Sequence, residues 1–238
     1  MSKKFKFSDF RNYFKARKPF MMTAFDDIVK HQPKGIITPY ITRESQDRMI
    51  QVDVFSELMA NRIIFFGDEV NSTTSAVAVA QLLYMRSVDK TAPVSVFIES
   101  PGGSVYDGLA VYDTMTMMKK DCEITTVALG LAASMGSILL QGGTRGKRSA
   151  LPHTRVLIHQ PLSGTGAGSH QATDIEILSK ETNILKKELI GILASASGKP
   201  FDEVYADCER DHWLKAEECL PGKYGEFGLI DTIADTLF

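Results

Sequence analysis

A serine and a histidine on short apolar segments are the residues of this sequence best suited to chemistry. Ser134 lies in Leu-Ala-Ala-Ser-Met-Gly-Ser (131–137), and 25 positions later His159 follows the apolar run of Val-Leu-Ile-His-Gln-Pro (156–161). A serine hydroxyl is a poor nucleophile at neutral pH unless a base accepts its proton, and histidine suits that role best near pH 7. The pair predicts nucleophilic catalysis if the fold brings the two residues together.

The residues around Ser134 fit a nucleophile elbow. Ala-Ala-Ser-Met-Gly (132–136) matches Gly-x-Ser-x-Gly with alanine at the first position. A turn from a strand into a helix would place the hydroxyl among the unpaired N–H groups of a helix N-terminus, where developing negative charge is favoured. The alternative is a serine that only caps a helix.

His159 has the most rigid setting among the five histidines. His31 lies in the N-terminal segment, His170 in a Gly-rich stretch, and His153 follows a proline in a predicted turn; the fifth is His212. His159 directly follows the predicted strand 155–158. A structural histidine with satisfied hydrogen bonds is the alternative interpretation.

A third catalytic residue should be a carboxylate that orients the imidazole ring. The candidates are Asp207, Glu209, Asp211 and Asp231, and spacing alone does not choose among them.

Two Gly-rich segments are candidate ligand-binding loops. Gly102-Gly103 follows a predicted strand and could supply an N–H donor to an oxyanion hole, or form a simple β-turn. Gly142–Arg148 is too short for a P-loop, and Arg148 stands where a Ser or Thr is required. We therefore expect no ATPase activity in this chain.

Composition excludes several classes of protein. The 238 residues carry a formal net charge of −2, which gives no sign of nucleic-acid binding. Cys122, Cys208 and Cys219 lack metal-site spacing, so we expect neither a disulfide framework nor a bound metal or other cofactor. No apolar run approaches the roughly 18 residues that cross a membrane. The expected setting is the cytoplasm.

Alternating strand and helix patterns predict an α/β fold with parallel strands and helical crossovers. The chain suits one domain (36–238) after a basic, aromatic-rich leader (1–35), for which the open readings are a disordered arm, a propeptide, an organelle presequence and a docking segment. The expected strands are 63–66, 94–98, 124–129 and 155–158. One helix is expected to begin after the capping residues 71–74, and two more are expected at 105–118 and 134–140.

A later helix has an unusually regular apolar seam. Its apolar positions alternate spacings of three and four, with Thr182 in one place, as in a helix that packs along another helix. This apolar seam could pack against the rest of its own domain or against a second copy of the chain, and the pattern alone does not decide between these two alternatives. Gly198 and Pro200 end the helix. The seam consists of Ile175, Leu178, Leu185, Leu189 and Ile192.

Three blocks in this order (99–115, 128–137 and 146–161) resemble the ClpP family of self-compartmentalised serine peptidases. The resemblance covers about 36–233 and implies a crotonase-like α/β fold with a protruding handle helix, assembling into stacked rings. It implies Ser134 as nucleophile, His159 as general base and Asp211 as the acidic member.

The same resemblance implies further roles. Gly103 and Met135 would supply the oxyanion-hole N–H groups, and Gly102 and Gly164 would lie along the substrate strand. Glu209 and Arg210 match a pair that contacts the opposite ring, although aspartate is common where Glu209 stands.

The implied assembly is two heptameric rings around a closed chamber that degrades unfolded polypeptides delivered by an AAA+ unfoldase. Residues 164–169 lengthen the handle loop by about three positions compared with the family. Two alternatives stay open: an acyl-CoA enzyme on the same fold, and a non-catalytic ring subunit.

Overall fold

The computed structural model describes residues 39–45, 48–164, 169, 171–222 and 227–234. Within these residues seven strands form one mixed sheet: β3 (Ile63–Phe66), β4 (Val94–Ser100), β5 (Ile124–Ala133), β6 (Arg148–Ala150), β7 (Arg155–Ile158), β8 (His212–Lys215) and β9 (Thr232–Ile233). The order is β3-β4-β5-β6-β9, with β7 paired to β5 and β8 paired to β7. All pairings are parallel except that of β7 with β8.

The long strand β5 divides the sheet and sets the position of the site. Its first part pairs with β6, and its last three residues, Leu131–Ala133, pair with Arg155–Leu157 of β7. Because parallel strands present their carboxyl ends at one edge, the residues that follow β5 and β7 lie together there. Those residues are Ser134 and His159.

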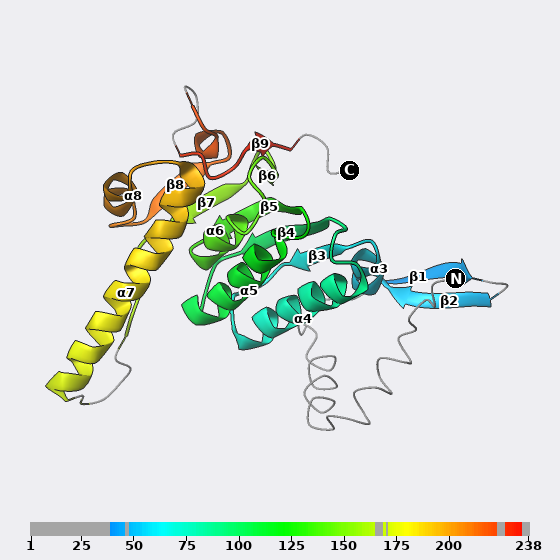
Figure 1. Cartoon of the computed structure of the whole chain (residues 1–238), viewed down its shortest axis with the longest axis horizontal. Coiled ribbons are helices and arrows are strands. Elements are labelled where there is room, and N and C mark those ends of the chain that lie inside the picture. Colours follow the sequence, from blue (N-terminus) through cyan, green and yellow to red (C-terminus); the bar gives the residue numbers. More distant parts are fainter. Residues whose placement is uncertain (1–38, 46–47, 165–168, 170, 223–226, 235–238) are drawn as a thin grey trace.

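Helices cover the sheet and connect its parallel strands (Figure 1). Helix α4 (Ser72–Val88) begins at a capping box made by Asn71 and Thr74, and α5 (Val105–Met118) begins at Ser104. These polar caps satisfy N–H groups that the first helical turn leaves unpaired. The other helices are α3 (Val54–Ala60), α6 (Met135–Leu140), α8 (Phe201–Asp207) and the 3-10 turn η1 (Glu217–Cys219).

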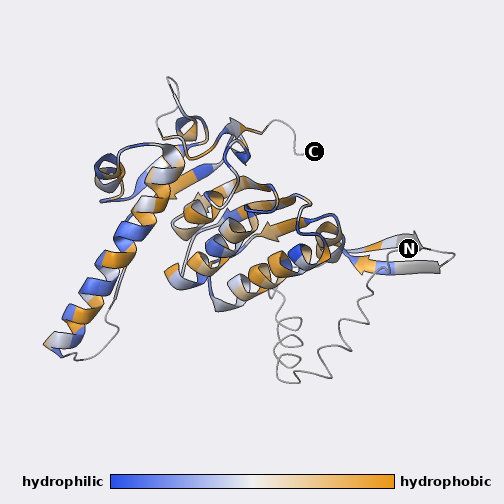
Figure 2. Ribbon diagram, in the orientation of Figure 1, coloured by the Kyte–Doolittle hydropathy of each residue, from blue (hydrophilic) through white to orange (hydrophobic). Residues whose placement is uncertain are grey.

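The core lies between the sheet and its helices, and Figure 2 shows apolar residues along the central strands and in the helices α4, α5 and α6. Ile98, Met115, Ile124 and Leu140 are fully buried there. A hairpin of β1 (Tyr40–Ser45) and β2 (Arg48–Asp53) extends away from this body.

Helix α7 (Ala172–Ser197) projects from the body, and only its C-terminal half joins the core (Figure 1). Leu189 and Leu193 are buried, whereas Ile175, Ile177 and Ile184 are 48%, 61% and 52% exposed. The helix ends at Gly198, whose φ of 78° is the left-handed conformation that glycine adopts most readily at this position.

A buried arginine joins the base of α7 to the sheet. All the N–H groups of the Arg148 guanidinium are directed at acceptors: Asp231, Gln141, and the carbonyl groups of Ala196 and Gly228. Burial by itself would raise the pKa of Asp231, but the hydrogen bonds from Arg148 and the neighbouring positive charge hold it below its usual value.

The α/β class and the predicted helix 105–118 are confirmed, as are the strands 63–66 and 155–158. The strands starting at Val94 and Ile124 run further than predicted, to Ser100 and Ala133. The hairpin, α3, α8 and the short strands β6, β8 and β9 were not predicted. The proposed leader 1–35 lies outside the described residues.

Candidate active site

Ser134 sits in a strained turn between β5 and α6. Its φ of 53° and ψ of −122° are rare for a residue other than glycine. The turn is held because the Ser134 N–H donates to the Leu157 carbonyl at 2.9 Å, and the Ser134 carbonyl accepts from the Ser137 N–H and hydroxyl. This geometry is that of a nucleophile elbow. The Ser134 side chain makes no helix-capping hydrogen bond, so the capping alternative is wrong.

The Gly102-Gly103 segment lies directly against this turn. A Cβ at Gly102 would be 2.5 Å from the Ser134 Cβ, and one at Gly103 would be 2.2 Å from the Val70 carbonyl oxygen. Their φ values of 97° and 143° also favour glycine. Only residues without side chains allow this backbone to approach the serine so closely.

Two backbone N–H groups beside Ser134 have no acceptor among the described residues. Gly103 lies opposite Val70, but the hydrogen bonds at this point are made by the residues on either side of Gly103. The Val70 N–H donates to the Gly102 carbonyl, and the Ser104 N–H donates to the Val70 carbonyl, so the Gly103 N–H makes no described hydrogen bond. Met135 is the first residue of α6, so its N–H lacks a partner within the helix. Both groups are therefore available to an oxygen atom that develops negative charge.

His159 follows β7 and shares a cavity of about 470 Å³ with Ser134. Its Nδ1 lies 2.5 Å from the Gln160 carbonyl oxygen. A carbonyl oxygen only accepts, so Nδ1 carries the proton in a neutral ring, and Nε2 keeps the lone pair that a general base needs. The structure describes no hydrogen bond between His159 and the Ser134 hydroxyl.

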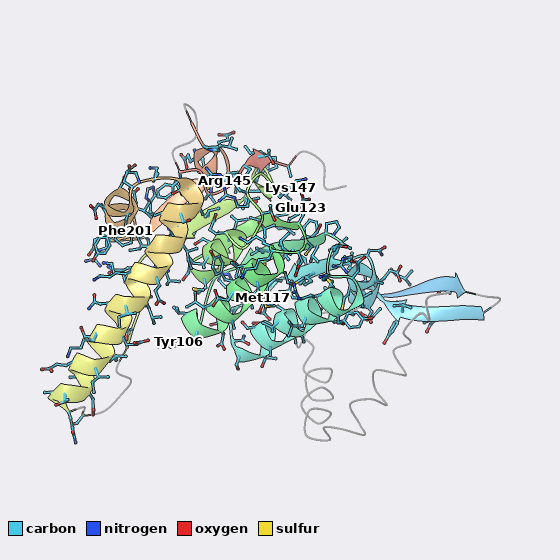
Figure 3. The ribbon with its side chains drawn as sticks, in the orientation of Figure 1. Tyr106, Met117, Glu123, Arg145, Lys147 and Phe201 are labelled. Atoms are coloured by element: carbon cyan, nitrogen blue, oxygen red, sulfur yellow. The ribbon has the colours of Figure 1, made fainter. Side chains whose placement is uncertain are left out.

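The rest of the cavity is mostly apolar. Leu189, Ile190 and Leu193 of α7 form one wall, and Leu162 and Pro161 extend from the end of β7. Tyr106, at the start of α5, reaches toward α7 (Figure 3), and its hydroxyl donates to Glu181 at 3.0 Å. This contact ties the first turn of α5 to the outer part of α7.

Three of the four candidate carboxylates are engaged elsewhere. Asp231 binds Arg148 at 2.8 Å, Glu209 binds Lys186 at 2.9 Å, and Asp207 lies 3.6 Å from His212. Asp231 is therefore wrong as a candidate for orienting the imidazole.

Asp211 is the carboxylate that the strand pairing brings toward His159. The last pair of the β7–β8 ladder is Ile158 with His212, so the next residues in antiparallel register are His159 and Asp211. Asp211 is exposed, and no described hydrogen bond joins it to His159. The backbones of His159 and Asp211 therefore lie opposite each other, while the His159 Nδ1–H faces the Gln160 carbonyl and not the Asp211 carboxylate.

Gln160 is a residue of this site that sequence analysis missed. Its N–H donates to the Cys208 carbonyl at 2.7 Å, and its Nε2 donates to the Glu209 carbonyl at 2.7 Å. It therefore fastens the strand that ends at His159 to the segment that carries Asp211. Its place directly after the histidine was the signal available in the sequence.

The remaining predicted residues have separate places. Glu209 pairs within its own chain with Lys186, which also lies 4.1 Å from the Tyr205 ring centroid. Arg210 and Gly164 are exposed, the latter at the edge of a segment outside the described residues.

The three cysteines are free and buried, and burial raises the pKa of Cys208 and Cys219 to about 12. No helix of the described part of the chain combines the length and the apolar character needed to cross a membrane.

Comparison with known proteins identifies the family. The model of the Clp protease family matches residues 45–236. The chain is 48% identical to the ATP-dependent Clp protease proteolytic subunit of Bacteroides fragilis (strain YCH46), over 94% of this chain and 97% of that protein. The protein of the same name from Porphyromonas gingivalis is 44% identical over 96% of this chain and 98% of its own length.

These matches cover the elbow at Ser134, the glycine loop beside it and the strand that leads to His159, so the relatives share the whole region in which the site lies. The chain belongs to the Clp protease family of serine peptidases.

Proposed function

We propose that this chain cleaves peptide bonds with Ser134 as nucleophile, His159 as general base and Asp211 as the residue that orients the imidazole. The observation that carries the proposal is the strained elbow at Ser134, which shares one cavity with His159 and lies against two backbone N–H groups that have no acceptor in the described part of the chain. A turn of this conformation has a structural cost, and such strain is concentrated at functional sites.

In the proposed reaction, Ser134 Oγ attacks the peptide carbonyl carbon while His159 Nε2 takes the hydroxyl proton. The carbonyl oxygen becomes an oxyanion and accepts hydrogen bonds from the Gly103 and Met135 N–H groups. As the C–N bond breaks, the imidazolium returns the proton to the leaving amine. Water then attacks the acyl-enzyme with the same base, which releases the second product and restores the serine.

Asp211 completes the site when the His159 ring turns its Nδ1–H from the Gln160 carbonyl to the carboxylate. The β7–β8 register supports this step, because the two backbones already lie opposite each other. A carboxylate partner stabilises the imidazolium better than a neutral carbonyl does, and an Asp-to-Asn change in such a triad typically costs about 10⁴ in rate.

The substrate is an extended, unfolded polypeptide. It would pair its backbone with the chain near Gly102 and Gly164, so that main-chain hydrogen bonds provide affinity for many sequences. The apolar wall formed by Leu189, Ile190 and Leu193 would receive an apolar side chain next to the scissile bond. No metal or other cofactor takes part in the proposed reaction.

The proposed particle is a tetradecamer of two heptameric rings that encloses the sites in one chamber. Support comes from the projecting half of α7, where the described residues of the same chain leave Ile175, Ile177 and Ile184 about half exposed. Glu209 and Arg210 would contribute to the contact between rings. The curated relatives are ATP-dependent, which supports an AAA+ Clp ATPase as the partner that unfolds and delivers substrates.

The proposed role is protein quality control in the cytoplasm, with an organelle matrix as the alternative, and with residues 1–35 as a leader before the peptidase domain 36–238. Binding to nucleic acid or membranes forms no part of this role.

The test is labelling of the purified chain with a fluorophosphonate, combined with hydrolysis of short fluorogenic peptides. We expect labelling of Ser134, and loss of both labelling and hydrolysis in Ser134→Ala. His159→Ala should fold and assemble, because this side chain is only part-buried, but it should label at least 10²-fold more slowly.

The outcomes separate the alternatives. Labelling at Ser134 excludes an acyl-CoA enzyme that works through carboxylates. A chain that assembles by native mass spectrometry, yet neither labels nor cleaves any peptide, would be a non-catalytic ring subunit and would contradict the proposal.

A further inference from the structure

The cavity beside Ser134 has an uneven distribution of charge. Among the described residues that line it, Glu69 is the only carboxylate, and neither lysine nor arginine accompanies it. The other titratable lining residue is His159. A peptide that enters this cavity therefore meets an apolar wall from α7 and a negative charge from the segment between β3 and α4.

The backbone around Glu69 is rigidly held next to the glycine loop. Val70 donates to the Gly102 carbonyl at 2.7 Å and accepts from the Ser104 N–H at 2.8 Å. The Glu69 carbonyl accepts from the Thr74 hydroxyl at 2.7 Å, within the capping box that starts α4. Glu69 is thus carried by the same turn that fixes the Gly102-Gly103 backbone against Ser134.

The Glu69 carboxylate has no cationic partner among the described residues. The side chain is exposed, and the polar contacts of Glu69 run through its backbone. The adjacent Asp68 is also exposed, with its carboxylate accepting from the Glu69 N–H at 2.7 Å, so it adds negative charge instead of neutralising it. An uncompensated carboxylate beside a substrate path attracts cations and repels anions.

We propose that Glu69 is a specificity-determining residue that favours substrates with a lysine or arginine close to the scissile bond and disfavours substrates with an acidic residue there. The inference rests on the proposed peptidase function and adds a charge preference to it. A lone carboxylate on an exposed rim suits an ammonium or guanidinium group of a passing peptide, because such a pair forms without burying either charge.

The expected effect is modest, because both groups remain in contact with water. Exposed ion pairs change an equilibrium by about 1.5- to fivefold. At the substrate position nearest Glu69, a lysine peptide should exceed its glutamine counterpart in kcat/KM by that factor, and its glutamate counterpart by about tenfold. Salt should reduce these ratios, since the screening length falls from about 10 Å at 0.1 M to about 3 Å at 1 M.

The experiment uses the full chain and internally quenched peptides that share one leucine before the scissile bond. Each of the three positions before that leucine, and each of the three positions after the scissile bond, carries lysine, glutamine or glutamate in turn, and kcat/KM is measured at 0.1 M and 1 M NaCl. Glu69→Gln should abolish the lysine-to-glutamine preference at low salt. The matched control is Glu217→Gln, which removes an exposed carboxylate on η1 outside the cavity and should leave the preference intact.

A second measurement separates this inference from the peptidase proposal. Ser134→Ala binds peptides without cleaving them, and fluorescence anisotropy of labelled lysine and glutamate peptides reports the charge preference directly. If the wild-type chain cleaves nothing but Ser134→Ala still prefers the lysine peptide, the peptidase proposal fails and the role of Glu69 stands. Lysine-to-glutamine ratios within 1.5-fold of unity at every position, or an unchanged ratio in Glu69→Gln, overturn the inference.

Discussion

Replacing Asp231 with alanine should strongly destabilise the chain, because it removes the partner of a buried charge. Asp231 accepts four hydrogen bonds, from the Gly146 N–H, the Arg148 N–H and two guanidinium nitrogens, at 2.8–3.1 Å. The side chains of Arg148 and Asp231 are 4% and 15% exposed. Removing one member of a buried pair leaves the other uncompensated and costs about 3–5 kcal/mol.

The assay is urea unfolding and thermal unfolding, each at one fixed protein concentration and followed by circular dichroism. A loss of about 3–5 kcal/mol corresponds to a fall in melting temperature of roughly 10 °C for a chain of this length. The control is Glu123→Ala, which breaks the Lys147–Glu123 pair at 3.2 Å, seen at the surface in Figure 3. These side chains are 48% and 42% exposed, so the loss should stay below about 1 kcal/mol.

The pH dependence provides a further check. The pKa of Asp231 is lowered in the folded chain, so its contribution is complete above the usual carboxyl pKa and is lost as pH falls through the lower folded value. The stability difference between wild type and Asp231→Ala should therefore shrink below about pH 4. If Asp231→Ala loses no more than the Glu123→Ala control at neutral pH, the description of Arg148 as a charge that depends on this partner is wrong.

Three more outcomes follow from the site. Gly102→Ala should lower kcat/KM by at least 10², because its Cβ would displace the nucleophile. The control Gly146→Ala, which has a similar φ but open space around it, should reduce stability alone, and equal losses of activity in the two variants would contradict this prediction. Gln160→Leu should reduce kcat about tenfold with KM within twofold, measured on one peptide, since it loosens the acid-bearing segment without touching substrate. Cys208 should react slowly with iodoacetamide at pH 8 by mass spectrometry, because burial raises its pKa to about 12, and rapid alkylation of the folded chain would refute its burial.

Local signals predicted the longer elements well. The capping residues at 71–74 predicted the start of α4, the pattern over 105–118 predicted α5, and Gly198 marked the end of α7. Short strands such as His212–Lys215 have too few residues for an alternating pattern, and they form because a neighbouring strand offers hydrogen bonds. The polar hairpin at 40–53 lacks the turn residues that would have revealed it.

The site was predictable only in part, because some of its residues are brought together by contacts between distant segments of the chain. Ser134 and His159 stood out by residue type and by their place next to apolar segments. Asp211 could not be chosen from spacing, because its relation to His159 depends on the antiparallel pairing of β7 with β8. Glu69 was also hidden, since a segment before α4 enters the cavity only through its contact with the distant glycine loop.

The outer half of α7 has a consequence for how the protein should be handled. The helix is about 39 Å long, and Ile175, Ile177 and Ile184 face water on the half that leaves the body. Fully burying an exposed isoleucine contributes about 1.5–3 kcal/mol, so covering these half-exposed side chains contributes roughly half of that each, and this driving force weakens as temperature falls. Any assembly held through these side chains is therefore cold-labile, and chilled, dilute samples should contain more single subunits than warm, concentrated ones.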